Sequence, residues 1–457
     1  MEVNLRAVVL DILTEIEKEG EFSHVTINNA LSKYQYLDRT QRAFINRLSL
    51  GTIECRIELD YILNKYSKTP VNKMKPVIRR IMRMAVYQII YMENVPDSAA
   101  CNEAVKLAAK RGFTGLKGFV NGVLRNIARN KNDIQYPDKL SETEKYMSVK
   151  YSMPDWIIQL WKEYMSYEEI EDILAGMKKD KKTYIRCNTL KGNTEYIKKV
   201  LEEENVTVKP VKDIPYAYEI SDYDHLTALK SFNEGLYQIQ DISSMIAGEY
   251  VSPAKDSFII DVCAAPGGKS VNAALKIAEA AYGDIAGIPS NGIDKEVLES
   301  ITGNVIARDV SDYKASLIED NVERLGIHNI DVQVCDALIK DNTLIEKADI
   351  VIADLPCSGL GIMGRKPDIR YNISKEKISD IVKLQKDILT IVSSYVKPGG
   401  VLVYSTCTIN RAENEENADW ICNKLGYTKA EEYNQMLPSA KADNDGFFVA
   451  RLIKTSK

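Results

Sequence analysis

Residues 257–270 read SFIIDVCAAPGGKS. Their first half is a near-continuous apolar run typical of a buried strand, and their second half has two glycines followed by Lys269 and Ser270. Comparable apolar runs follow along the chain, at 303–310, 330–337, 349–356 and 400–407. Amphipathic segments, such as 313–326 and 377–396, lie between these runs. This alternation predicts a doubly wound parallel sheet that is buried on both faces.

Ligands of an open parallel sheet bind beyond the carboxyl ends of its strands, so the residues that follow each strand are the candidates for a site. The small residues of 263–268 would let the backbone approach a ligand closely. The segment is not a P-loop, because Cys263 stands where the first glycine is needed, and it is not Gly-x-Gly-x-x-Gly. An ordinary tight turn is the alternative, and we favour ligand binding.

Acidic residues follow the second and third expected strands. Asp309 is placed to accept hydrogen bonds from ribose hydroxyls, although acids there also cap helices, and Asp312 is better placed for the cap. Asp336 follows the next strand, where a carboxylate can lie near an adenine ring. The 39 residues between Lys269 and Asp309 exceed what one crossover helix needs. We expect an inserted surface segment at about 280–303.

Two cysteines, 50 positions apart, end the fourth and fifth expected strands. Cys357 lies just after Asp354 in Asp-Leu-Pro-Cys, and Cys407 lies in Ser-Thr-Cys-Thr. Either thiol alone could be a core residue. Two thiols beside a carboxylate favour a reaction in which a thiolate adds to C6 of a pyrimidine, so that C5 can accept a methyl group. Spacing alone does not choose the nucleophile.

The first part of the chain has a different character. Residues 1–132 show helical apolar spacing and contain 21 Lys and Arg against 13 Asp and Glu, a net charge of +8 within a chain of net charge −5. Within 65–131 the count is 14 basic residues against 3 acidic ones. A basic helical module favours a nucleic-acid partner over a merely solvated face. Residues 133–150 resemble a connector, and 151–250 mix helices with short strands.

Composition excludes several classes. No apolar stretch is long enough to span a bilayer, and the charged residues near Met1 argue against a signal peptide. Eight scattered cysteines without a CxxC pair, and only three histidines, argue against a metal site or a disulfide scaffold. A reducing, cytoplasmic location is expected.

Long segments resemble a known family. DVCAAPGGKS, DLPCSGLGIMGRKPDIRYN and YSTCTINRAENEEN are similar to the RNA cytosine-C5 methyltransferases that use S-adenosylmethionine. The resemblance extends to YQIQDISSMIAGEYVSP and to DGFFVARLIK. It covers the whole chain and is greatest to the bacterial Sun/RsmB-type enzymes. It implies an all-α NusB-like domain at 1–132, a small α+β linker domain at 133–250 and a Rossmann-like methyltransferase domain at 251–457.

The resemblance also implies roles for the site residues. Cys407 is the nucleophile, Cys357 assists release of the product, and Asp354 contacts the cytosine near the methyl donor. The residues that wrap S-adenosylmethionine, and its product S-adenosylhomocysteine, are Cys263, Ala264, Ala265, Pro266, Gly267, Gly268 and Lys269, with Asp309 on the ribose, Asp336 near the adenine and Asp354 beside them. The implied substrate is 16S ribosomal RNA before full subunit assembly, bound by a monomer, without DNA, membrane or metal.

Two departures from the family pattern stand out. Leu355 replaces the usual alanine of Asp-Ala-Pro-Cys and is expected to tune the fit of the cofactor. The long gap also leaves Asp294 as an alternative to Asp309, which we prefer because it directly ends an apolar strand. Two rival readings stay open: Cys357 as the nucleophile, as in DNA cytosine methyltransferases, and an inactive RNA-binding assembly factor.

Overall fold

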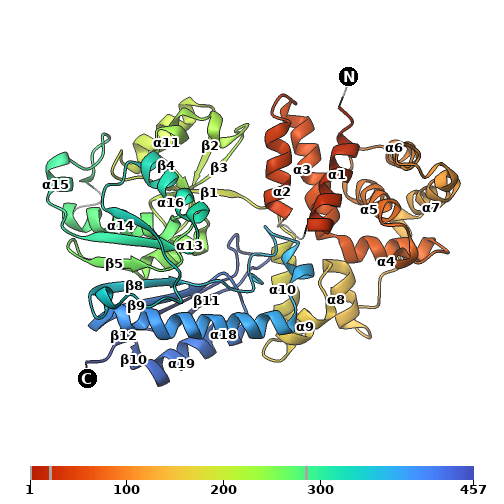
Figure 1. The fold of residues 1–457 in the computed structure, drawn as a ribbon. Coiled ribbons are helices and arrows are strands. Elements are labelled where there is room, and N and C mark those ends of the chain that lie inside the picture. The colour runs from red at the N-terminus through yellow and green to blue at the C-terminus, as the bar shows by residue number, and fades with distance from the viewer. Residues whose placement is uncertain (1–2, 20–22, 284–286, 457) are drawn as a thin grey trace. The chain divides into compact units, whose positions relative to one another are not determined.

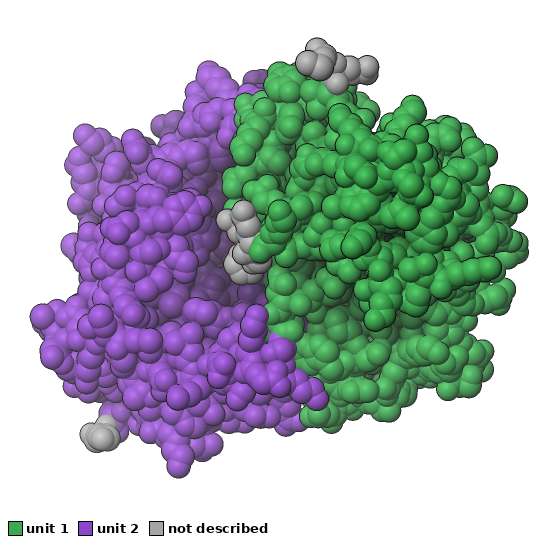
Figure 2. All heavy atoms as spheres, turned by 45° about the vertical axis from the view of Figure 1, so that its right-hand side comes forward, with its two compact units in different colours: residues 1–178, 363–373 green, residues 179–362, 374–457 purple. Residues whose placement is uncertain are grey.

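The computed structural model describes residues 3–19, 23–283 and 287–456. The chain forms two compact units, which Figure 2 distinguishes by colour. Unit 1 comprises Met1–Lys178 and Met363–Ile373, and unit 2 comprises Lys179–Ile362 and Ser374–Lys457. None of the helices in the described ranges is both long enough and apolar enough to cross a bilayer.

Unit 1 is built of helices, as its sequence predicts (Figure 1). The helices are α1 (Leu5–Glu19), α2 (Ser23–Lys33), α3 (Arg39–Glu54), α4 (Arg56–Tyr66), α5 (Pro76–Tyr91), α6 (Asp97–Lys110), α7 (Lys117–Arg129), α8 (Thr143–Tyr151), α9 (Asp155–Lys162) and α10 (Tyr167–Met177). Capping boxes of Asp38 with Gln41 and of Ser166 with Glu169 begin α3 and α10. Helix α5 begins at Pro76 and is buried along most of its length, so it forms the centre of the core.

A short segment from far along the chain completes unit 1. Residues 363–373 contain helix α17 (Ile369–Asn372). The buried guanidinium of Arg370 donates hydrogen bonds to the carbonyls of Tyr151 and Ser152, at 3.2 and 3.3 Å, where α8 ends. The Asp368 carboxylate accepts hydrogen bonds from the backbone N–H and the hydroxyl of Ser23. The sequence gives no sign of this association.

Unit 2 begins with a small α+β part. Its antiparallel sheet has the order β2-β3-β1-β4. The elements are β1 (Thr183–Cys187), α11 (Thr194–Glu203), β2 (Thr207–Pro210), β3 (Ala217–Ser221), α12 (Lys230–Asn233), β4 (Tyr237–Ile239) and α13 (Ile242–Glu249). Apolar residues of β1, β3 and α11 pack together into one core, including Ile185, Ile197 and Tyr218. The expected mixture of helices and short strands is confirmed here.

The main sheet of unit 2 has the order β10-β12-β9-β8-β5-β6-β7, with β11 paired to β12. The strands are β5 (Phe258–Asp261), β6 (Asn304–Asp309), β7 (Ile330–Val334), β8 (Ala348–Asp354), β9 (Val396–Thr406), β10 (Tyr427–Lys429), β11 (Asn434–Met436) and β12 (Phe447–Lys454). The five expected strands are present and parallel. Strand β12, which was not among the expected strands, lies antiparallel to β9 and makes the sheet mixed.

Helices cover both faces of this sheet, as the alternation predicted. They are α14 (Gly268–Tyr282), α16 (Asp312–Leu325), α18 (Lys375–Val392) and α19 (Glu415–Leu425). Ile259 and Ile352 face the apolar residues of α14, whereas their neighbours Ile260 and Val351 face α18 and α19. Successive residues of a strand point to opposite faces, which explains the continuous apolar runs. Ser311 caps α16, so the expectation that Asp312 does so was wrong by one residue.

The segment expected as a surface insertion is partly packed. It contains the end of α14 and α15 (Lys295–Glu299), and residues 284–286 lie outside the described residues. Ile288 and Ile293 are buried in a small cluster with Leu190, and Asn193 donates a backbone hydrogen bond to the Pro289 carbonyl. The Gly, Pro and Asn residues that suggested a surface excursion bend the chain between these anchors.

Candidate active site

The glycine loop lies between β5 and α14, beyond the carboxyl end of the central strand. Gly267 has φ +96°, a conformation that residues with a side chain rarely adopt. A Cβ there would lie 3.1 Å from Cγ2 of Ile318. Glycine therefore lets the backbone turn directly into the N-terminus of α14. Because Ala264, Ala265 and Gly268 are also small, backbone of this loop borders the sheet edge without bulky side chains.

Asp309 holds the same loop from the neighbouring strand. Its carboxylate accepts a hydrogen bond from the Ala265 N–H at 3.0 Å and from the Val310 N–H at 2.8 Å. The ammonium nitrogen of Lys314 lies 3.0 Å from Oδ1 of the same carboxylate. Asp309 thus ends β6 beside the glycine loop, whereas the alternative, Asp294, precedes α15 in the inserted segment. Asp336 lies after β7 and accepts a hydrogen bond from the Leu338 N–H.

Asp354 joins the glycine loop to the two thiol-bearing strands. Its Oδ2 lies 2.5 Å from Nζ of Lys269, and its Oδ1 accepts a hydrogen bond from the Ser405 hydroxyl at 2.8 Å. The ammonium of Lys269 also lies 4.9 Å from the centre of the Phe447 ring. The carboxylate is therefore fixed by a charge-assisted hydrogen bond at the ends of β8 and β9.

The two cysteines that end β8 and β9 are brought together. Their sulfur atoms lie 3.2 Å apart, and both residues are free thiols. The hydrogen bond with Cys407, followed by burial, raises the pKa of Cys357 well above its ordinary value. Cys357 therefore keeps its proton and is suited to donate it to the sulfur of Cys407.

Glu413 connects the two cysteine loops, and the sequence reasoning missed it. This fully buried carboxylate accepts hydrogen bonds from the Ser358 N–H at 2.7 Å and from the Asn410 side-chain amide at 2.8 Å. Burial raises the pKa of Glu413 above its ordinary value. The hydroxyls of Ser358 and Thr408 lie 2.8 Å apart and form a second link. Glu413 was missed because the sequence of residues 413–417, ENEEN, does not show which of its acids is buried.

A buried acid lies behind the glycine loop. Asp261 ends β5 and accepts a hydrogen bond from the Ser270 hydroxyl at 2.6 Å. Burial raises the pKa of Asp261 to about 7. Burial, and then the nearby carboxylates of Asp261 and Asp309, raise the pKa of the Cys263 thiol well above its ordinary value. A thiol held neutral in this way suits packing against a ligand rather than nucleophilic attack.

The residues at this edge fit a nucleoside-type cofactor. Gly267 and Gly268 offer backbone without Cβ atoms, and a Cβ at Gly267 would crowd the Ile318 side chain. Asp309 ends β6 and Asp354 ends β8, the two strands that flank β5, and Asp336 follows β7, the next strand beyond β6. All the residues expected for the site lie at the carboxyl ends of β5 to β9, and the structure brings Lys269, Asp354, Cys357 and Cys407 together.

Comparisons with known proteins match three segments of the chain to family models. Residues 3–129 match the NusB family, residues 153–223 match the ferredoxin-like domain of Methyltr_RsmF/B-like proteins, and residues 295–453 match the family described as 16S rRNA methyltransferase RsmB/F. The expected NusB-like, α+β and methyltransferase parts are thereby confirmed.

The chain is similar along most of its length to proteins named ribosomal RNA small subunit methyltransferase B. It is 30% identical to the probable enzyme of Bacillus subtilis over 414 residues, which cover 90% of this chain and 87% of the relative. It is 29% identical to the probable enzyme of Synechocystis, covering 99% of this chain and all of the relative. The solved structure of PH0851 shares its fold, with a TM-score of 0.78 and 24% identity over 99% of this chain. The chain belongs to the ribosomal RNA small subunit methyltransferase B family, within the RsmB/F group of 16S rRNA methyltransferases.

Proposed function

We propose that the protein transfers a methyl group from S-adenosylmethionine to C5 of a specific cytosine in 16S ribosomal RNA, through a covalent bond between Cys407 and C6. Membership of the family makes it a 16S rRNA methyltransferase that depends on S-adenosylmethionine. We propose in addition that the modified base is cytosine, that C5 receives the methyl group and that Cys407 forms the covalent bond. The observation that carries it is the pair of sulfur atoms 3.2 Å apart beside the Lys269–Asp354 pair.

The thiol pair supports Cys407 as the nucleophile. The raised pKa keeps the proton on Cys357, so we assign the attack to the other sulfur of the pair, that of Cys407. Attack on C6 forms the S–C6 bond and moves the electrons of the C5–C6 double bond toward C5 and the N3 side of the ring. Cys357 would then serve later, as a proton-bearing neighbour of the departing sulfur. This division of labour agrees with the roles implied by the family resemblance.

Asp354 and Lys269 support the charge changes of the ring. A carboxyl group at the position of Asp354 can bond to N3 and the exocyclic amine of cytosine, where charge develops on attack. Lys269 and Ser405 fix its orientation from two sides. The bound cofactor supplies an electrophilic methyl group, which C5 accepts. Removal of the C5 proton by a base then restores the double bond, the S–C6 bond breaks, and 5-methylcytosine leaves.

The residues of the glycine loop would hold the cofactor. Backbone of Cys263 to Gly268 approaches it, Asp309 receives its ribose hydroxyls, and Asp336 lies near its base. Lys269 begins at the cofactor loop and ends at Asp354, so one side chain links the two binding regions. Leu355 is buried in the core beneath this edge, where it can tune the fit.

The experiment is trapping of the adduct. RNA that contains 5-fluorocytosine cannot lose a proton from C5, so the wild-type enzyme should form a stable covalent complex with it. Cys407→Ser should form none, and Cys422→Ser, a change on α19, should trap as the wild type does. Cys357→Ser should accumulate the adduct even with ordinary RNA. An adduct that persists in Cys407→Ser but is lost in Cys357→Ser would reverse the assignment.

The attack on C6 by a partly buried thiol restricts the form of the RNA substrate. The target cytosine must leave its stack to reach a partly buried thiol, so a loop or bulge of the RNA is the suitable substrate. We place the reaction in the cytoplasm, on RNA before full subunit assembly, and carried out by a monomer. Transfer of labelled methyl groups to deproteinised 16S RNA tests this, and its absence with tight binding retained would favour an inactive assembly factor.

A further inference from the structure

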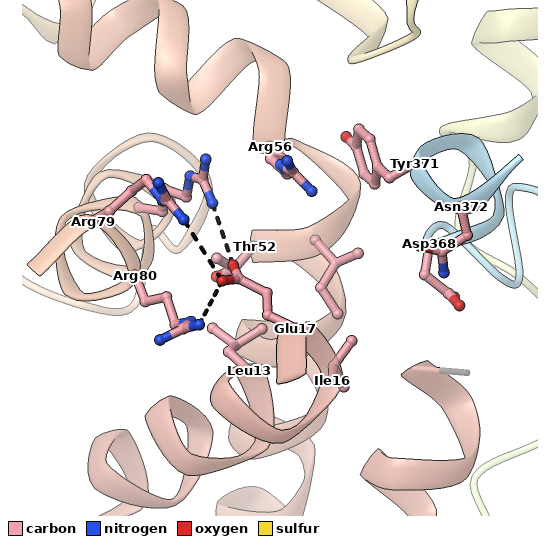
Figure 3. A pocket seen from close by; sticks show the side chains of 12 residues that line it. Leu13, Ile16, Glu17, Thr52, Arg56, Arg79, Arg80, Asp368, Tyr371 and Asn372 are labelled. Carbon is pink, nitrogen blue, oxygen red and sulfur yellow. Dashed lines mark hydrogen bonds and ion pairs between the residues drawn. The ribbon is translucent and has the colours of Figure 1, made fainter. Parts of the chain in front are cut away.

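Unit 1 contains a cavity of about 290 Å³ whose wall is rich in arginine (Figure 3). The lining residues come from α1, α3, α4, α5 and the segment 363–373. They are Leu13, Ile16, Glu17, Thr52, Ile53, Arg56, Arg79, Arg80, Arg83, Asp368, Tyr371 and Asn372. Four of these are arginines and two are acids, so the lining has an excess of positive charge.

The arginines of α5 are crowded on one side of the helix. Arg79 and Arg83 are four residues apart, so both lie on the same face, and Arg80 is adjacent. Like charges at this spacing repel each other, and burial together with Arg83 lowers the pKa of Arg79. Arg80 and Arg83 are buried, whereas the side chain of Arg79 is a quarter exposed. Arg79 is therefore the guanidinium of this cluster that a ligand can reach.

One carboxylate occupies the centre of this cluster. Glu17 lies 2.6 Å from Arg80, 3.5 Å from Arg83 and 3.8 Å from Arg79, as Figure 3 shows for the labelled side chains. Arg83 has a second partner, Asp60, which it contacts through both nitrogens of its fork at 2.7 Å. Glu17 is therefore shared by three guanidinium groups, and Arg79 is the most distant of them.

The opposite wall adds a cation on an aromatic ring. The Arg56 guanidinium lies 4.7 Å from the centre of the Tyr371 ring, in the segment 363–373. The Asp368 carboxylate on this wall is committed to Ser23, through the backbone N–H and the hydroxyl. The Asp368 carboxylate therefore interacts with the first residue of α2. Arg56 and Arg79 both line the cavity.

We propose that this arginine pocket binds a phosphate group of the RNA substrate. Guanidinium forks match the paired oxygens of a phosphate, and an aromatic ring carrying an arginine suits the sugar–base side of the same nucleotide. In the absence of RNA, Glu17 takes the place of the phosphate and holds the arginines. The inference rests on the proposed function, because it assigns to RNA a contact on the NusB-like unit.

The rival explanation is a purely structural ion-pair network. The two explanations predict different effects of one substitution on the affinity for RNA. If Glu17 competes with the phosphate, Glu17→Gln should strengthen RNA binding several-fold. If the arginines serve only to bind Glu17, the same change leaves RNA binding unchanged or weakens it through loss of structure.

The test is the binding of a fluorescently labelled single-stranded fragment of 16S RNA to the full chain, measured by anisotropy over a range of salt concentrations. Arg79→Gln should weaken binding several-fold and reduce the log–log salt slope by about 0.7, the value for one phosphate contact on a single strand. Arg129→Gln removes the same charge from an exposed position of α7 and should weaken binding clearly less. Equal effects of Arg79→Gln and Arg129→Gln would overturn the proposal.

Two further measurements distinguish a loss of binding from a loss of folding, and an RNA phosphate from a free phosphate ion. Arg79→Lys keeps the charge but loses the planar fork, and should give intermediate binding with a wild-type salt slope even if Arg79→Gln proves unstable. Inorganic phosphate at constant ionic strength should stabilise the wild type only weakly. Strong stabilisation by phosphate that Arg79→Gln abolishes, with RNA binding unchanged, would assign the pocket to a free anion and refute the RNA contact. Methyl transfer by the wild type, measured in parallel, reports separately on the proposed function.

Discussion

At the residue scale, the arrangement of the two thiols depends on groups that do not touch the substrate. Glu413 uses one carboxylate oxygen for the loop of Cys357 and the other for the loop of Cys407, through Ser358 and Asn410. Gln385 extends the same network by donating a hydrogen bond to the Pro356 carbonyl. Both oxygens of the buried carboxylate accept hydrogen bonds. An amide in its place would have only one acceptor oxygen, and its NH2 group would face a donor.

The first prediction concerns this carboxylate. Glu413→Gln places an amide NH2 against the donor of Ser358 or of Asn410, which leaves a buried donor unpaired at a cost of about 1–3 kcal/mol. We expect methyl transfer to fall by at least about tenfold, with the yield of trapped adduct reduced. Adding Asn410→Asp supplies an acceptor for the new NH2, so the double variant should recover most of the activity.

A purely structural role would predict the opposite pattern. In that case Glu413→Gln would lower the melting temperature without changing the adduct yield of the folded fraction. Failure of the double variant to recover adduct formation, although it folds, would also contradict the positioning role. Single-turnover trapping and thermal melting on the same preparations decide between these outcomes.

A second residue-scale prediction follows from Asp261. Its pKa of about 7 in the folded protein lies above the ordinary value of 3.8, so the folded state binds more protons between these values. The stability of unit 2 should therefore fall as pH rises from about 4 to 7, by at most about 4 kcal/mol from this group. Asp261→Asn keeps an acceptor for Ser270 and should remove that part of the pH dependence. Asp256→Asn, at an exposed position, is the control.

Urea unfolding followed by Trp420 fluorescence measures this effect, since Trp420 is the tryptophan of unit 2. An unchanged slope of stability against pH in Asp261→Asn would contradict the assignment.

At the element scale, helix ends are completed by side chains from elsewhere in the sequence. Helix α8 ends with Ser152 in the left-handed conformation, and its last carbonyls receive the buried guanidinium of Arg370. A cation at a helix C-terminus also interacts favourably with the helix dipole. The second terminal nitrogen of the guanidinium donates to the Met363 carbonyl, so Arg370 joins the start of its own segment to the end of α8.

The third prediction is that Arg370→Met destabilises unit 1 by about 2–4 kcal/mol. The carbonyls of Tyr151 and Met363 lose this donor, and the Ser152 carbonyl keeps only the 3.5 Å hydrogen bond from the Tyr371 hydroxyl. Lys375→Met changes a nearby exposed residue in the same way and should have little effect. Trp156 and Trp161 lie in unit 1, so urea unfolding in a Trp420→Phe background reports on this unit. Equal midpoints for the two methionine variants would contradict the prediction.

At the scale of the whole molecule, the two units are not consecutive in sequence. The chain leaves unit 2 after Ile362, contributes residues 363–373 to unit 1, and returns to unit 2 at Ser374. That excursion follows directly on the loop of Cys357. Deletion of residues 1–132 would therefore remove the partners of Asp368 as well as basic charge. Single substitutions such as Arg79→Gln are the sharper test of RNA binding.

The fourth prediction is that a fragment of residues 1–178 is less stable than unit 1 in the intact chain, and that a synthetic peptide of residues 363–373 stabilises it. The peptide binds the folded fragment and not the unfolded one, so the urea midpoint should rise with peptide concentration. A peptide carrying Asp368→Ala and Arg370→Ala is the matched control and should have no effect. No shift with the natural peptide at millimolar concentration would contradict the association.

The sequence by itself determined the elements and the order of the chemistry along them. The five apolar runs of unit 2 became parallel strands, because burial on both faces leaves a pattern that needs no knowledge of distant residues. Asp354, Cys357 and Cys407 were placed correctly at strand ends for the same reason. Neighbouring parallel strands meet at one edge whatever their loops contain.

Only the tertiary structure decided how distant segments combine. The antiparallel entry of β12, the 3.2 Å separation of the Cys357 and Cys407 sulfurs, the burial of Glu413 and the transfer of residues 363–373 to unit 1 have no local signature. The physical reason is that a strand or helix period reports which face is buried, and not which partner buries it. Charged residues such as Glu413 and Arg79 look solvated until packing supplies the groups that surround them.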